Sequence, residues 1–532
     1  MASDESTSNA LLRRKATRRA VLAGGVAAAG VAGAYAATGD RLRLFGDDGP
    51  TPEAVRSDTS AIKQESVKIN HLLRRAGFGM TKEEYDHYHG LGLQATLEEL
   101  LAYNAIDDSE AEAAGKETAN ATQPQLASPA FAWLARMAKT KRPLQEKMTL
   151  FWHGLLTSQI SVVVDAAAMT DQIDFYRTHA LDRFPDILKG ASKDRAMMSY
   201  LDVANSTRGA PNENYARELM ELFALGVGNF SEKDVREASR AFTGWQVPRQ
   251  RGEPGRYVLG EPVFRPQRFD SGSKTVLGKT GNFGPDDIVD IIVEQPASAQ
   301  YIVRRLFAFF VYANPTEADL KPFVETYVSN GKSIRSVVEA LFRSDIFYSP
   351  KAYRALVKSP VEYFVSAIKA VNGQERVLEA VRGGQRRGGI VGDMGQTLYE
   401  PPNVAGWPGN EEWLNASTMF ARLNFVNGIT GGGPQNQQRP RPNAPANGAM
   451  PANGGRPANG AAPANTAPTS FDTGTASQAL AHYLPMALDD NVLPETRQVL
   501  LDYAGGADVQ LSAEQLRGLV YLILGSPQFH LS

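Results

Sequence analysis

Residues 209–244 read GAPNENYARELMELFALGVGNFSEKDVREASRAFTG, and this stretch indicates the kind of fold that the chain adopts. In its first half Tyr215, Leu219 and Phe223 recur at helical spacing on one face, while charged residues occupy another. Gly226 follows the last apolar residue of this pattern, where a helix commonly ends.

The second half of the stretch begins with a helix-capping signal. Ser231 is followed three residues later by Asp234, which resembles a capping box. Val235, Ala238 and Phe242 then form the next apolar stripe. The stretch therefore predicts a helix, a short turn and a second helix.

This pattern recurs along the chain and predicts an all-α fold built as one large multi-helix domain. Further helical units are expected at residues 130–151, 285–294, 297–312, 333–342 and 359–371. Only residues 256–277 hold enough Val, Phe, Gly and Pro to suggest short β or irregular structure.

The N-terminus has the pattern of an export signal. Thr17-Arg18-Arg19 precedes an uncharged run of small apolar residues from Ala23 to Ala37, and Ala34-Tyr35-Ala36 supplies a cleavage site. Residues 1–36 are therefore predicted to be a twin-arginine signal peptide. The mature chain would be periplasmic or extracellular.

Composition divides the remainder into four parts. A polar linker is expected at residues 37–65, followed by the main helical domain at 66–427. Residues 428–474 are dominated by Asn, Pro, Ala and Gly and repeat Pro-Ala-Asn, which predicts a disordered insertion. Residues 475–532 return to helical periodicity and are expected to pack on the main domain.

Composition also excludes several classes of function. The 532 residues contain no cysteine, which rules out disulfides, thiolate metal sites and a cysteine nucleophile. A net charge of −2 gives no basic excess for nucleic acid. No later stretch is long and apolar enough for a membrane span, so the mature chain is expected to be soluble.

Five segments stand in this order along the chain: Phe151-Trp152-His153, Gly209–Phe223, Asp234–Trp245, Lys274–Gly278 and Pro401–Gly409. Together they resemble the bacterial family catalogued as domain of unknown function 1800, over about residues 71–425 and the C-terminal helices. The resemblance implies that twin-arginine export is common and that a companion from another exported family is often encoded nearby. It implies no established reaction.

This chain departs from that pattern at two places. Leu155 and Leu156 stand where relatives often have a second histidine after Phe-Trp-His. Phe269 precedes Asp270 where relatives often have His-Asp. A catalytic or metal-binding role of those histidines in relatives would not carry over to this chain.

Four residues are candidates for acid–base chemistry. They are Glu213, Glu218, Asp270 and His153. The structural alternative for Glu213 is an ion-pair ladder, in which Glu213 and Glu221 each lie four residues from Arg217. The alternative for His153 is a core histidine with one hydrogen bond.

Five residues are candidates for ligand binding. They are Asn212, Asn214, Arg217, Trp407 and Trp413. Aromatic faces beside polar groups suit a sugar ring. The alternatives are helix caps for the two asparagines and core anchors for the two tryptophans.

Three functions from different classes remain. The first is an exported binding or assembly protein that acts with a companion exported protein in the cell envelope. The second is an extracytoplasmic enzyme acting on a glycan or another polar envelope polymer. The third is a protein that carries an organic cofactor or a carboxylate-held cation, and no particular cofactor or metal site is predicted.

Overall fold

The computed structural model of the chain describes residues 58–119, 128–251, 257–376, 389–431 and 474–532. The predicted signal, with Arg18, Arg19, Ala34 and Ala36, lies outside these residues. So do most of the predicted linker and residues 432–473 of the predicted insertion.

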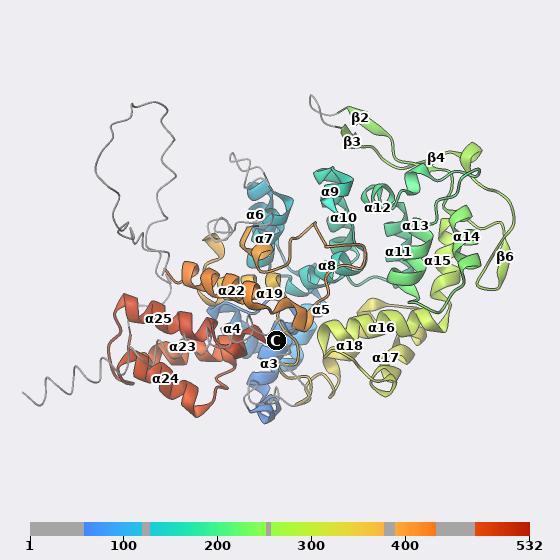
Figure 1. The fold of residues 1–532 in the computed structure, drawn as a ribbon. Coiled ribbons are helices and arrows are strands. Elements are labelled where there is room, and N and C mark those ends of the chain that lie inside the picture. Colours follow the sequence, from blue (N-terminus) through green and yellow to red (C-terminus); the bar gives the residue numbers. More distant parts are fainter. Residues whose placement is uncertain (1–57, 120–127, 252–256, 377–388, 432–473) are drawn as a thin grey trace, which may run out of the picture.

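The described chain is mainly helical, which confirms the all-α prediction (Figure 1). The helices before the strands are η1 (Thr59–Lys63), α3 (Glu65–Ala76), α4 (Lys82–Leu91), α5 (Leu93–Leu101), η2 (Tyr103–Ala105), α6 (Ser109–Ala119), α7 (Pro129–Lys139), α8 (Pro143–Leu155), α9 (Ile160–Val163), α10 (Ala166–Thr178), α11 (Phe184–Lys193), α12 (Arg195–Tyr200), η3 (Val203–Asn205), α13 (Asn214–Glu218), η4 (Leu219–Ala224) and α14 (Glu232–Ala241). Those after the strands are α15 (Pro285–Val293), α16 (Pro296–Phe310), α17 (Glu317–Ser329), α18 (Ile334–Arg343), α19 (Pro360–Ala370), η6 (Gln374–Arg376), α21 (Gly389–Asp393), η7 (Asn410–Trp413), α22 (Ala416–Ile429), α23 (Ala476–Leu488), α24 (Pro494–Ala504), α25 (Ala513–Leu524) and η8 (Pro527–His530).

Short strands fill the segment between α14 and α15. They are β1 (Trp245–Gln246), β2 (Arg249–Arg251), β3 (Tyr257–Leu259), β4 (Val263–Phe264), β5 (Lys274–Val276) and β6 (Lys279–Gly281), with the turn η5 (Pro266–Arg268) between β4 and β5. They form three separate antiparallel pairs, β1 with β4, β2 with β3 and β5 with β6. The predicted β region therefore exists, and it begins earlier in the chain than expected.

The stretch at residues 209–244 folds as two helices with one departure from a regular α-helix. The capping box at Ser231 and Asp234 is present at the start of α14. The first helix becomes a π-helix after Glu218, where the amide N–H of Leu225 donates to the carbonyl of Met220 at 3.0 Å. Such wider turns are rare and are frequently found at functional sites.

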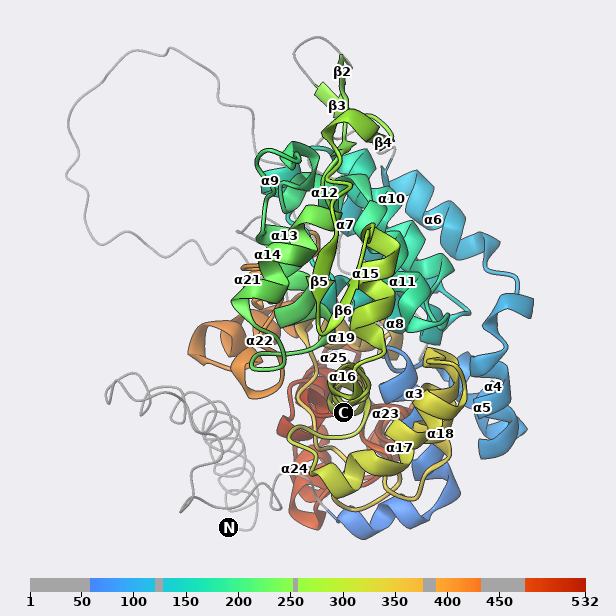
Figure 2. The same cartoon turned by 90° about the vertical axis from the view of Figure 1, so that its right-hand side faces the viewer.

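One large apolar cluster runs through the described chain, from Ile69 in α3 to Phe529 near the C-terminus. Figures 1 and 2 show the C-terminal helices α23–α25 beside the N-terminal α3 and α4, with α22 next to them. Among the described residues, no helix has the length and hydropathy needed to cross a membrane.

Asp489 joins three distant segments inside this body. The side chain is fully buried, and its carboxylate forms ion pairs with Arg74 of α3 and with Arg354, the latter at 3.3 Å. The Tyr353 hydroxyl donates to it at 2.7 Å. Burial alone would raise the pKa of Asp489, but the two guanidiniums lower it to about 2.

Replacing Asp489 with Asn should destabilise the protein by about 3 to 5 kcal/mol at neutral pH, because two buried guanidiniums lose their counter-charge. Asn tolerates the left-handed backbone at this position, where φ is 60°. The measurement is urea denaturation of both proteins. Since the folded pKa is depressed, the difference should stay constant above about pH 4 and shrink as the pH falls toward 2.

Asp490→Asn is the matched control, because this neighbouring carboxylate is 56% exposed and pairs with Arg497 at the surface. It should cost less than about 1 kcal/mol. Equal losses in the two variants would contradict the role assigned to the buried network.

Candidate functional site

His153 lies near the end of α8 and is fully buried. Its Nε2 accepts a hydrogen bond from the backbone N–H of Tyr399 at 3.0 Å, and burial lowers its pKa to about 3. The imidazole is therefore neutral, with its hydrogen on Nδ1. Among the described residues this Nδ1 has no hydrogen-bond partner.

Aromatic rings surround His153, and Trp407 is one of them. Two of the predicted site residues, His153 and Trp407, therefore lie side by side. The ring centroids of Trp407, Trp133 and Tyr399 lie 5.3, 5.6 and 5.7 Å from that of His153. Trp407 is half-buried, whereas Trp413 is buried in a small apolar cluster beside it. Trp413 thus has the surroundings of a core anchor.

The loop that carries Trp407 is held tightly against the end of α8. Tyr399 has a φ of 63°, a left-handed conformation that is strained for a bulky residue, and its carbonyl accepts from the Ile160 N–H at 2.8 Å. Gly406 approaches α8 so closely that a Cβ there would lie 2.3 Å from the Gly154 carbonyl oxygen. Only glycine fits at this position.

Glu213 belongs to a surface ion-pair network. Arg217 contacts Glu213 at 3.1 Å and Glu232 at 2.8 Å. Among the described residues Glu221 forms no ion pair with Arg217. The π-helix that begins at Leu219 changes the angular spacing on which the predicted ladder depended.

The two predicted asparagines differ in their contacts. The Asn212 side chain accepts from the Asn214 N–H at 2.9 Å, as a residue at a helix start commonly does. Its own N–H donates to the Ser206 hydroxyl at 3.0 Å. Asn214 is exposed.

Asp270 is held by Arg240 through two hydrogen bonds of 2.7 and 3.1 Å. It also accepts from the Gly272 N–H at 2.9 Å. The hydrogen bonds from Arg240 lower the pKa of Asp270, so this carboxylate stays ionised and is a weak proton carrier.

Glu218, unlike Glu213 and Asp270, is a predicted catalytic carboxylate that is not paired with an arginine in the part of the chain that the structure describes. It is half-buried at the junction of α13 and the π-helix, and among the described residues its carboxylate has no ion pair or hydrogen bond. Burial raises the pKa of Glu218, Glu221 raises it further, and Arg217 opposes the shift. An unpaired carboxyl with a raised pKa is suited to general acid chemistry.

Sequence reasoning missed Tyr200 and Glu400. Burial raises the pKa of Tyr200 to about 12, and the charges of Glu218 and Glu400 add to the shift. Tyr200 donates to Gln159 Oε1 at 2.9 Å, and Glu400 accepts from the Ser161 N–H at 3.1 Å. Glu400 directly precedes the Pro401-Pro402 pair, which was the available signal for it, whereas Tyr200 had none.

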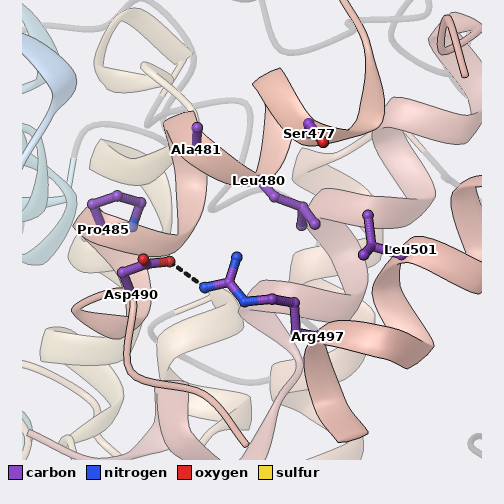
Figure 3. A pocket seen from close by; sticks show the side chains of 7 residues that line it. All are labelled: Ser477, Leu480, Ala481, Pro485, Asp490, Arg497 and Leu501. Atoms are coloured by element: carbon purple, nitrogen blue, oxygen red, sulfur yellow. Dashed lines mark hydrogen bonds and ion pairs between the residues drawn. The ribbon is translucent and has the colours of Figure 1, made fainter. Parts of the chain in front are cut away.

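A separate cavity of about 340 Å³ lies between α23 and α24 (Figure 3). Asp490 and Arg497 line it and form an ion pair with each other, and Leu480 and Leu501 form apolar walls. Pro485 has no N–H to donate to the Ala481 carbonyl one turn earlier. None of the predicted site residues lines this cavity.

His153→Gln should change how stability depends on pH. Because His153 stays neutral when folded and is protonated in the unfolded chain, the wild type should lose about 2 kcal/mol more than the variant between about pH 7.5 and pH 5. Urea denaturation at both pH values tests this. Parallel losses would show that His153 carries a proton in the folded protein.

The comparisons with known proteins concern family membership. No curated protein and no solved structure is significantly similar to the chain. The family described as protein of unknown function (DUF1800) matches residues 71–531, which include α23–α25 as well as the preceding helices. The chain belongs to the DUF1800 family.

Proposed function

We propose that the chain is an exported binding or assembly protein that acts with a companion exported protein in the cell envelope. The observation that carries this proposal is the saturation of three of the four groups predicted to catalyse, all but Glu218. Arg217 neutralises Glu213, Arg240 neutralises Asp270, and His153 is buried as a hydrogen-bond acceptor. An acid–base pair needs free carboxylates that converge on one substrate position.

The mature chain should bind a protein when it is recovered from the compartment to which it is exported. The experiment is expression with the native signal, followed by capture from the envelope fraction through a C-terminal tag. A partner in a fixed ratio to the chain is expected. A clean monomer without bound protein would contradict the proposal.

An Arg18→Lys, Arg19→Lys double variant is the control for this experiment. It keeps the charge of the signal and removes the pair that the twin-arginine route reads. The variant should stay in the cytosol and bring down no envelope partner. Its normal appearance outside the cytosol would overturn the export part of the proposal.

Glu218 favours a second candidate function, an enzyme acting on a glycan or another polar envelope polymer. The unpaired carboxyl lies beside a π-helix, and its charge acts together with that of Glu400 on Tyr200, so a proton-transfer site is supported at this one place. Its neighbours would then position the substrate or the second carboxylate.

Glu218→Gln should abolish turnover on a panel of envelope glycans and leave the melting temperature nearly unchanged, because no contact of the carboxylate is lost. Glu221→Gln serves as the matched control and should keep any activity. Absence of turnover in the wild type, or loss in both variants, would count against this second function.

A further inference from the structure

The short strands and their turns lie at one end of the molecule, beside α9. In Figures 1 and 2, α9 and β2–β4 lie at this end. Backbone hydrogen bonds join its segments: Arg208 N–H donates to the Arg268 carbonyl at 2.8 Å, and Arg265 N–H donates to the Gly244 carbonyl at 2.7 Å. Residues 206–212, 244–249 and 263–269 therefore form one continuous surface.

These three segments carry four arginines and no Asp or Glu, in a chain with a net charge of −2. Arg208, Arg249 and Arg265 are exposed and Arg268 is half-buried. Among the described residues none of the four has an ion pair. We call these four residues the arginine surface. Three acids flank these segments and each pairs with an arginine outside the surface: Glu213 with Arg217, Glu261 with Arg195 and Asp270 with Arg240.

Exposed apolar side chains border the arginine surface. Phe264 is 39% exposed beside Arg265, and Val164 is 74% exposed at the end of α9. Asp165, the residue after Val164, accepts from the Leu259 N–H at 2.6 Å, and Val258, the residue before Leu259, is 37% exposed. Arginine and aromatic residues beside apolar area are typical of protein interfaces.

At the same end, one edge of β2 has no strand partner in the part of the chain that the structure describes. In the β2–β3 pair Arg249 stands opposite Leu259, and the neighbouring Gly260 N–H donates to the Pro248 carbonyl. Because hydrogen-bonded and open pairs alternate, the Arg249 N–H and carbonyl point away from β3. On the other edge of the pair, the backbone groups of Leu259 are already hydrogen-bonded to side chains. Its N–H donates to Asp165, and its carbonyl accepts from Arg195.

We infer that the partner docks here through an acidic, extended polypeptide segment that adds a strand to the edge of β2. This inference rests on the proposed function and names the chemistry of its partner. Guanidiniums bind carboxylates in a bidentate manner, which supplies the charge complementarity. Only a polypeptide can also pair with the open backbone groups of β2, which favours protein over an acidic glycan.

The test measures binding of defined peptides to the mature full-length chain by fluorescence anisotropy. The probe is a labelled peptide of about twelve residues with alternating Glu and Thr. Its counterpart alternates Glu and Pro, so it has the same charge and lacks the N–H groups needed for strand pairing. The Glu-Thr peptide should bind at least about tenfold more tightly than the Glu-Pro peptide, and its affinity should fall as the salt concentration rises.

Arg208→Glu with Arg265→Glu should reduce binding of the Glu-Thr peptide at least about tenfold. Arg305→Glu with Lys321→Glu, on α16 and α17, changes the charge equally at exposed residues outside this surface and should leave binding unchanged. Circular dichroism melting confirms that each variant is folded. Equal loss in both pairs, or no loss in the first, would overturn the assignment.

Two further outcomes would refute specific parts of the inference. Equal affinity for the Glu-Pro peptide would exclude strand addition. Binding of polygalacturonate in preference to the peptide would assign the surface to an acidic glycan.

Envelope capture with the Arg208→Glu, Arg265→Glu variant separates this inference from the proposed function. A partner bound by wild type and variant alike refutes the docking surface alone. A partner bound by neither protein refutes the function itself, and loss of the partner in the variant alone supports both.

Discussion

Asp489 sits in the interior with both oxygens engaged, and its pairing with Arg74 and Arg354 ties α3 to the C-terminal helices. Removing a carboxylate from water costs several kcal/mol unless counter-charges and hydrogen bonds replace the lost hydration. Here the two arginines and the Tyr353 hydroxyl replace it. The N-terminal α3 and the C-terminal α23 are thereby fixed in one body.

Local signals account for the parts of the fold that the sequence predicted well. Capping at Ser231, the break at Gly226 and the apolar stripes depend only on residues a few positions apart, so they are readable from a single chain. The π-helix after Glu218 was not predicted, because it widens a turn without changing the apolar pattern. For the same reason, the sequence did not reveal that the π-helix separates Glu221 from Arg217.

The candidate site was only partly predictable, and sequence separation explains the division. The contact of Glu213 with Arg217 spans four residues and was foreseen, whereas the contact of Arg217 with Glu232 spans fifteen and was not. The approach of Trp407 to His153 joins two segments even farther apart, and only the folded chain shows it. Charge pairing across loops leaves no periodic trace in the sequence.

The hydrogen bond from Asn70 to the Pro485 carbonyl spans 415 residues, and this separation has a consequence for biosynthesis. A ribosome adding about 5 to 20 residues per second would expose α3 roughly 20 to 80 s before its partner helix exists. The buried polar face of α3 must therefore wait, solvated or chaperoned, until α23 has been synthesised.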